Sequence, residues 1–365
     1  MVCSTINFLH DLSSNRFKPD WFLSFYILGI LFSTKGPIKF YCVILAEYAT
    51  NLGFVYELFQ IILEIICVFV LYLLLIIVLL VRVAFVTLME QKILGAVQIR
   101  FGPTKVGYWG VLQPFADAVK LFCKEIRLPW GVNMFYFYIG PFIRIFVVLF
   151  LWFLFPLMWG GYDFELGLVY FICLGGLGVF PIFLRGWSSN SKYSLLGALR
   201  AIAQIISYEV RLSVIILRLV WVAGSFNLGV LIDQSFFSLG FLFFFLLSMI
   251  WFSSRLAECN RTPFDFSERE SELVSGFNTE YRSGGFVLIF LSEYARIIFM
   301  GLLFSLFFFR SKPNFFFIVK IFLVVFMFVW VRGTLPRFRY DFLMSLAWKS
   351  YLPVSLCALC YYLIY

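Results

Sequence analysis

The chain is organised around an acidic stretch that reads Ala257-Glu258-Cys259-Asn260-Arg261-Thr262-Pro263-Phe264-Asp265 and continues Phe266-Ser267-Glu268-Arg269-Glu270-Ser271-Glu272-Leu273-Val274-Ser275-Gly276-Phe277. The chain then passes through Glu280 into another apolar run, which still contains Glu293. Acids alternate here with large hydrophobic residues, whereas a solvated linker would contain few hydrophobes. We therefore expect this stretch to fold back against the rest of the protein and to bury some of its acids. The alternative is a water-facing loop whose acids only keep it soluble.

Outside this stretch the composition is that of a membrane protein. Hydrophobic residues make up 62% of the chain and charged residues 13%, and several apolar runs exceed the ~20 residues that a helix needs to span a bilayer. The runs are continuous, whereas the strands of a membrane β-barrel are short and alternating. The net charge of +9 is spread through the connections between runs, which indicates membrane orientation and not nucleic-acid binding. We expect an all-α integral membrane protein.

Eight transmembrane helices are expected, at about 61–86, 138–159, 165–187, 195–222, 238–256, 284–309, 314–332 and 342–364. The chain accordingly divides into an N-terminal extension, residues 1–60, and a membrane domain, residues 61–365, whose acidic loop covers 257–284. The extension contains two short apolar runs, Trp21–Phe32 and Phe40–Ala46, which we interpret as an interfacial or re-entrant pair of helices. Residues 113–125 have helical period, with one apolar and one charged stripe, and are too short to span, so we expect an amphipathic helix in the interface.

Basic residues are concentrated in the connections that follow the first, third, fifth and seventh spans. They include Lys92, Arg100, Lys120, Lys192, Arg261, Arg337 and Arg339. The connections on the opposite side contain little beyond Arg310 and Lys312. By the positive-inside rule, the acidic loop faces the cytoplasm or the mitochondrial matrix. The 50 phenylalanines suggest a T-rich organellar gene.

The cysteines and the histidine do not predict a metal centre. Cys357 and Cys360 form the one C-x-x-C, in an apolar run without a second pair or a nearby His, whereas a zinc or iron–sulfur site needs four ligands. His10 is the sole histidine, so a pair of haem-ligating histidines is absent from the sequence. We expect this chain to bind no metal or flavin of its own.

Two spans contain charges that a lipid-facing helix would not tolerate. Residues 200, 204, 207, 208 and 211 share one helical face, with Glu209 beside it, and each mid-span charge costs ~2.5–3.5 kcal/mol on insertion scales. This face must therefore contact other helices or water. Glu209 is either part of a structural ion pair or a proton carrier, because a carboxyl group held in low dielectric can load and release protons near neutral pH. Glu293 has the same two interpretations, and Arg296 could pair with it along the helix.

Three stretches resemble the family of subunit 1 of respiratory complex I, the proton-translocating NADH:ubiquinone oxidoreductase. They are residues 90–103 (Glu90-Gln91-Lys92-Ile93-Leu94-Gly95-Ala96-Val97-Gln98-Ile99-Arg100-Phe101-Gly102-Pro103) with 113–121, residues 200–209 (Arg200-Ala201-Ile202-Ala203-Gln204-Ile205-Ile206-Ser207-Tyr208-Glu209), and the loop 257–281. The tail 330–341 belongs to the same pattern. The resemblance extends from about residue 62 to the C-terminus. It implies an eight-helix subunit of the mitochondrial inner membrane, with the acidic loop on the matrix side.

The resemblance also implies the function and the partners. The subunit would build much of a ubiquinone cavity, entered from the lipid beside the first span, the interfacial helix and the sixth span. An iron–sulfur cluster of a neighbouring hydrophilic-arm subunit would reduce the quinone, and small membrane subunits and lipids such as cardiolipin would be further partners. Buried carboxylates would then link quinone reduction to proton translocation.

Residue roles are carried over by position in the same motifs. The intramembrane members of the proton path would be Glu209, Glu258 and Glu293, and the loop members would be Asp265, Glu268, Glu270, Glu272 and Glu280. The quinone cavity would include Arg261, Phe277, Phe290 and Arg332, with the two arginines as partners of the loop acids or of the headgroup.

The sequence departs from the family pattern at several charged positions. Gln91 stands where the family commonly has Arg, and Arg269, Arg282 and Arg296 add positive charge beside the proposed acids, which leaves the individual roles of Glu270, Glu280 and Glu293 open. Two alternatives remain for the function: the matching membrane subunit of an energy-converting hydrogenase, and a stand-alone ion-coupled transporter. A transporter would be expected to show inverted repeats and broken helices, and neither is evident in the sequence.

Overall fold

The computed structural model describes residues 38–126, 128–155, 164–233, 241–265, 276–278, 280–309 and 315–364. The described residues form helices and connections, without a strand. The helices are α3 (Ile38–Val97), η1 (Tyr108–Gly110), α4 (Gln113–Phe122), α5 (Met134–Trp152), α6 (Gly167–Leu177), α7 (Val179–Ser188), α8 (Lys192–Ala223), α9 (Leu228–Asp233), α10 (Phe241–Glu258), η3 (Gly276–Asn278), α12 (Ser283–Phe308), α13 (Phe315–Thr334), α14 (Tyr340–Ser345), η4 (Leu346–Tyr351) and α15 (Leu352–Ile364). An all-α membrane protein is confirmed.

Each of the eight predicted spans contains one or more helices in its described part. Among the described residues, six segments are long and apolar enough to cross a membrane: Ile66–Val97, Met134–Trp152, Gly167–Ser188, Ser283–Phe308, Phe315–Thr334 and Tyr340–Tyr361. The other two predicted spans correspond to α8 and α10, of which α8 is the helix with the mid-span charges. Residues 113–122 form the predicted short amphipathic helix, α4, and none of its side chains is buried within this chain.

The chain consists of two units, Met1–Leu71 and Tyr72–Tyr365, and α3 contributes residues to both. In the first unit the described residues are helical throughout, so Phe40–Ala46, expected as one of a pair of short helices, is part of the long helix α3. The helix continues through residues 38–97, because the segment lacks proline and most of its residues are apolar. Residues 1–37, with the other predicted short helix, lie outside the described part.

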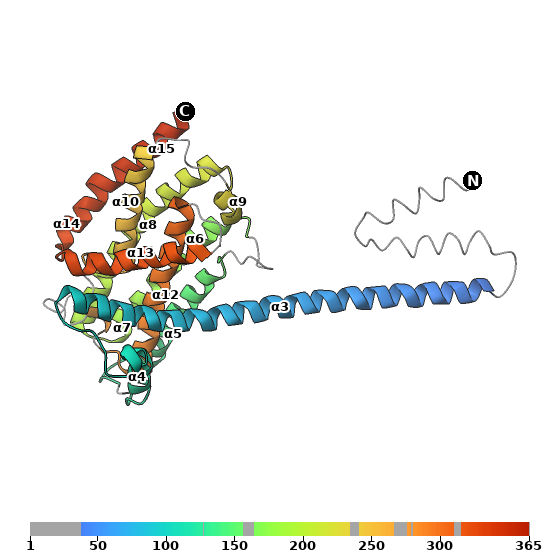
Figure 1. Ribbon diagram of the computed structural model, residues 1–365, viewed down its shortest axis with the longest axis horizontal. Coiled ribbons are helices and arrows are strands. Elements are labelled where there is room, and N and C mark those ends of the chain that lie inside the picture. Colours follow the sequence, from blue (N-terminus) through green and yellow to red (C-terminus); the bar gives the residue numbers. More distant parts are fainter. Residues whose placement is uncertain are drawn as a thin grey trace. The chain divides into compact units, whose positions relative to one another are not determined.

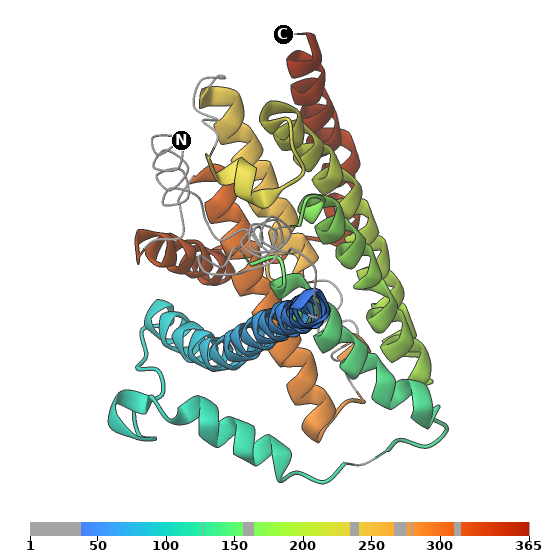
Figure 2. The same cartoon turned by 90° about the vertical axis from the view of Figure 1, so that its right-hand side faces the viewer.

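The second unit is a bundle in which α12 is the central helix. It lies against α5 and α13, while α8 lies against α7, α10 and α15 (Figure 1 and Figure 2). The apolar core includes Tyr208, Trp251, Phe299 and Phe307 from three of these helices. Two-thirds of the spanning part of α12 is buried, against about a quarter in α13, so α12 is the helix best placed to hold charged groups away from lipid.

The third predicted span is broken into α6 and α7 at Gly178. Pro181, in the first turn of α7, has no N–H to donate to the carbonyl four residues earlier, which is that of Leu177. The N–H of Gly178, at the end of α6, donates to the carbonyls of Leu174 and Gly175. This break lies in the membrane part of the chain, next to the buried charges described below.

Gly186 sets the closest approach between α7 and α8. A Cβ atom at this position would lie 2.2 Å from the Cβ of Ala198, so we expect Gly186→Ala to force the two helices apart and to lower stability by about 1–3 kcal/mol. Thermal unfolding of the assembled protein measures this. Gly284→Ala is the matched control, since a Cβ there meets nothing within 4 Å. Equal melting temperatures for the two variants would contradict the tight packing of α7 on α8.

Candidate functional site

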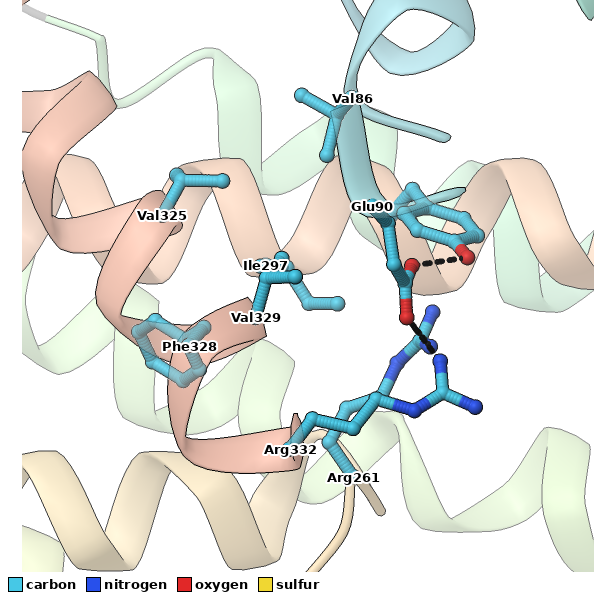
Figure 3. Close-up of a pocket in the computed structure, with 9 residues that line it drawn as sticks. Val86, Glu90, Arg261, Ile297, Val325, Phe328, Val329 and Arg332 are labelled. Carbon is cyan, nitrogen blue, oxygen red and sulfur yellow. Dashed lines mark hydrogen bonds and ion pairs between the residues drawn. The ribbon is translucent and has the colours of Figure 1, made fainter. Parts of the chain in front are cut away.

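A narrow pocket surrounds the carboxylate of Glu90 near the end of α3. Glu90 is 5% exposed, and its Oε1 atom accepts a hydrogen bond of 3.1 Å from Nη1 of Arg261 and a second one from the guanidinium of Arg332. Its Oε2 atom accepts a hydrogen bond of 2.5 Å from the hydroxyl of Tyr294. Figure 3 shows the carboxylate between these donors, with apolar side chains on the other side of the pocket. These apolar residues are Val86, Ile297, Val325, Phe328 and Val329.

Each polar group of the pocket comes from a different part of the fold. Glu90 lies one turn beyond Val86 on the inward face of α3, Tyr294 lies on α12 and Arg332 in the last turn of α13. Arg261 follows α10, and its guanidinium carbon lies 4.4 Å from the ring centroid of Tyr294. Although burial disfavours charge on Arg261, Tyr294 and the Glu90 carboxylate outweigh it and raise the pKa of this guanidinium. The pocket therefore has two cations for one anion.

Of the four predicted cavity residues, two meet in this pocket and a third lies close to it. Arg261 and Arg332 meet in this pocket, and the acid that they share is Glu90, which was not among the predicted site residues. A charged residue at the end of a long apolar run was the signal that could have found it. Phe290 lies one turn from Tyr294 on α12, with ring centroids 6.5 Å apart. The side chain of Phe277 lies outside the described residues.

Glu258 forms a second buried charge cluster at the end of α10. Its Oε2 atom lies 2.5 Å from Nη1 of Arg255, and its Oε1 atom lies 3.3 Å from Nη2 of Arg296 on α12. All three side chains are almost fully buried. The predicted pairing of Glu293 with Arg296 along α12 is therefore wrong, since Arg296 pairs with Glu258 instead. Burial, with the nearby Glu258 carboxylate, raises the pKa of the Cys259 thiol to about 12, so this thiol adds no charge.

Glu209 approaches the same cluster from α8. Its Oε1 atom lies 3.2 Å and 3.3 Å from the positions that Cβ atoms would take at Gly175 and Gly176 of α6. The half-buried carboxylate lies within electrostatic range of Glu258, Arg296 and Arg255. The expected burial of the polar face of α8 is confirmed for Gln204, Ser207, Tyr208 and Arg211.

Glu293 lies between the two clusters on α12. It is partly buried and within electrostatic range of Arg261, Arg185, Arg144 and the Asp265 carboxylate. Arg144, from α5, is also within range of Arg296 and donates from Nη1 to the carbonyl of Gly178 at 2.9 Å. Arg144 and Arg255 were missed as site residues, although each is a charge inside an apolar run and so carries the signal that identified Glu209.

The start of the acidic loop folds back on the bundle. Nε2 of Gln204 on α8 donates to the carbonyls of Ala257 and Phe264, at 2.8 Å and 2.9 Å, and so closes the turn between them. The N–H of Phe338 donates to the carbonyl of Pro263, which joins the tail 335–339 to the loop. The expectation that the loop folds back and buries acids is confirmed for residues 257–265.

The remaining loop acids are only partly described. Asp265 lies 4.0 Å from the guanidinium of Arg337, and Glu280 is partly exposed. Glu268, Glu270 and Glu272 lie outside the described residues. The described residues contain no group of three or more His, Cys, Asp or Glu placed to hold a metal ion.

Taken together, the described charges form a connected series through the second unit. Glu90 is in direct contact with Arg261, Arg261 lies within electrostatic range of Glu293, and Arg144 lies within electrostatic range of both Glu293 and Glu258. Arg296 and Glu209 complete it. Acidic and basic side chains alternate along this series.

A family model described as NADH dehydrogenase matches residues 70–363. Two similar relatives are the NADH-ubiquinone oxidoreductase chain 1 of Aedes aegypti, 53% identical over 78% of this chain and 91% of the relative, and that of Locusta migratoria, 53% identical over 82% and 94%. The chain 1 of Paracentrotus lividus is 47% identical over 77% and 90%. The range matched by the family model includes every residue of the site.

Proposed function

Because this chain belongs to the NADH dehydrogenase family, we propose that it forms the quinone cavity of a proton-pumping NADH:ubiquinone oxidoreductase and links quinone reduction to proton translocation. Membership of this family argues against a hydrogenase subunit and against a stand-alone transporter. The substrate is ubiquinone, and the electrons come from an iron–sulfur cluster of a hydrophilic-arm subunit. Small membrane subunits are further partners. The assembly lies in the mitochondrial inner membrane, with the acidic loop toward the matrix.

The observation that carries this proposal is the connected series of buried charges between the Glu90 pocket and Glu209. A protein that used its acids only for solubility would expose them, whereas Glu90 and Glu258 are almost completely buried and paired. Buried ion pairs cost desolvation and are weak evidence for stability by themselves, so a functional role explains them better. The Glu90 pocket opens the series at the side where the resemblance places quinone entry.

In the proposed mechanism, proton uptake by the quinone changes the charge of the loop acids, and that change alters the protonation of the buried acids next to them. Reduction of ubiquinone to ubiquinol takes two electrons from the cluster and two protons from loop carboxyl groups. The carboxylates left behind repel their neighbours, and two like charges ~4 Å apart interact by ~4 kcal/mol at an effective dielectric of 20. That energy is enough to change which of the acids Glu293, Glu258 and Glu209 hold protons. The arginines between them keep the total charge of the series near balance.

A photoreactive ubiquinone analogue tests where the quinone enters. We expect it to label the part of α3 around Glu90, residues 113–125 and the α12 segment around Tyr294, and excess ubiquinone should suppress the labelling. Mass spectrometry of the excised subunit from the native assembly identifies the peptides. Labelling confined to α15, on the other side of α8, would contradict the proposed entrance.

The exposed apolar stripe of α4 supports its proposed place in the membrane interface. Phe115, Val119 and Phe122 are exposed, and Lys120 and Lys124 are exposed on the charged stripe. Such a helix buries its apolar side in the acyl boundary and presents its lysines to anionic headgroups such as cardiolipin.

Gly176→Ala tests the role of Glu209 without changing a titratable group. The three atoms nearest to the added Cβ would all belong to the Glu209 carboxylate, the closest at 3.3 Å, so that the carboxylate must shift by a few tenths of an ångström. We expect a lower ratio of protons pumped to NADH oxidised, with an unchanged rate of NADH oxidation by artificial acceptors. Gly284→Ala serves again as the neutral control. Identical pumping ratios in the two variants would mean that the position of Glu209 is unimportant.

A further inference from the structure

Arg296 lies between two carboxylates that belong to different helices. Its Nη2 atom is 3.3 Å from Oε1 of Glu258, and the same atom is 2.9 Å from the position of a Cβ at Gly178. The Oε1 atom of Glu209 is 3.2 Å from the corresponding position at Gly175, three residues earlier. The guanidinium of Arg296 and the carboxylate of Glu209 therefore lie against the same glycine-rich segment, Gly175 to Gly178, and within electrostatic range of each other.

The two arginines that pair with Glu258 differ in how they are held. Arg255 lies over the rings of Trp251 and Phe171, with its guanidinium carbon 4.0 Å and 4.8 Å from their centroids, besides its short contact with Glu258. Arg296 is 1% exposed, and none of its three guanidinium nitrogens makes a hydrogen bond among the described residues. Nε and Nη2 of Arg255 also lack a hydrogen bond there, but Nη1 of Arg255 donates one to Glu258. Its contact with Glu258 is also the longer of the two. Arg255 is thus held at Glu258 by a hydrogen bond and two aromatic rings, and Arg296 by the longer ion pair.

The other charges around Arg296 leave Glu209 as the second partner. The charged and titratable groups that face it are Arg144 from α5, Glu209 from α8, and Arg255, Glu258 and Cys259 at the end of α10. The acids among them are Glu258, which already has Arg255, and Glu209, which has no ion pair among the described residues. Gly175, Gly176 and Gly178 present no side chain between the two positions.

We propose that Arg296 is a counter-ion shared by Glu258 and Glu209, which moves from one carboxylate to the other as their protons move. This inference rests on the proposed function and adds the group that links the two acids. When Glu258 takes up a proton from the loop side, Arg296 turns to Glu209, whose carboxyl group gives its proton to the next acid in the membrane arm. One proton enters and one leaves, so the charge of the cluster is unchanged. Transfer of the proton from Glu258 to Glu209 then returns Arg296 to Glu258.

Infrared difference spectroscopy of the assembled complex, with and without turnover, measures protonated carboxyl groups directly. Glu258→Gln and Glu209→Gln each identify the band of the acid that they remove. We expect Glu209→Gln also to abolish the turnover-dependent band of Glu258, because Arg296 then stays with Glu258 and keeps it ionised. We expect Arg296→Gln to shift the pH dependence of pumping upward by about one unit or more, since a cation at this range changes the proton affinity of a carboxylate by ~1–3 pH units.

Arg296→Lys keeps the charge and should retain most of the pumping and both infrared bands, which a purely structural role of the guanidinium would not predict. If native gels show that Arg296→Gln does not assemble, Arg296→Lys still tests the proposal. A Glu258 band that persists unchanged in Glu209→Gln would overturn the shared counter-ion and leave the proposed function standing. Normal pumping in both Glu258→Gln and Glu209→Gln would instead refute the proposed function itself.

Discussion

Glu258→Gln is expected to reduce proton pumping linked to ubiquinone reduction by about tenfold or more, the effect of ~1.4 kcal/mol on one step, while NADH oxidation by artificial acceptors continues. Glutamine keeps the shape of the side chain and can neither hold nor release the proton. It also leaves Arg255 and Arg296 without their shared anion. Glu209→Gln should have the same effect on pumping, because the proposed path passes through both acids. Proton uptake by vesicles, divided by NADH consumed, measures the result.

Two controls separate this effect from damage to the fold. Removing one partner of a buried ion pair can cost about 3–5 kcal/mol, so assembly of the variant complex is checked on a native gel. Asp341→Asn removes an acid whose pair with Arg339 is exposed on both sides, and such surface pairs contribute about 0–1 kcal/mol. We expect that variant to pump normally. Normal pumping by assembled Glu258→Gln and Glu209→Gln would exclude these acids from the path.

Glu90→Gln is expected to raise the KM for ubiquinone by about tenfold or more, with a smaller effect from Tyr294→Phe. Neutralising Glu90 leaves two guanidiniums in the pocket without their carboxylate, and Arg261 is buried enough for this to be costly. Tyr294→Phe removes one hydrogen bond to a charged group, which contributes about 1.5–3 kcal/mol, and keeps both ion pairs. Steady-state kinetics with a short-chain ubiquinone give the two KM values.

We expect the KM for ubiquinone of Arg332→Gln to lie between the values for Glu90→Gln and Tyr294→Phe. Arg332 is one-third exposed, so solvent screens its charge, and the pair of Glu90 with Arg261 remains in place. If the three variants had equal KM values, close to that of the unchanged protein, the pocket around Glu90 would not belong to the quinone path. The oxidation of NADH by artificial acceptors is again the control for the rest of the complex.

Much of the fold could be predicted from the sequence because its causes are local. Hydropathy over a window identifies a helix that can enter a membrane, and helical period identifies the amphipathic segment that became α4. The same local pattern predicted that the polar face of α8 would be buried. The third predicted span corresponds to one candidate membrane segment, Gly167–Ser188, in which α6 and α7 meet at Gly178 shortly before Pro181.

The site was less predictable, because its contacts join residues that are far apart in sequence. Glu90 pairs with Arg261 and Arg332, which lie 171 and 242 positions further along the sequence. It accepts a hydrogen bond from Tyr294, which lies 204 positions further along. Arg296 illustrates the same difficulty over a shorter range. Its spacing allowed a pair with Glu293 on its own helix, and the packing of α10 beside α12 gave it Glu258 instead.

By itself the sequence determined that this protein is a helical membrane protein, which helices carry charge, and that these charges could not face lipid. Only the tertiary structure decided which acid meets which arginine, because helix packing sets those distances and no periodicity along one helix encodes them. The physical reason is that hydrophobicity acts residue by residue, whereas the energy of a buried charge depends on the partner within a few ångströms of it.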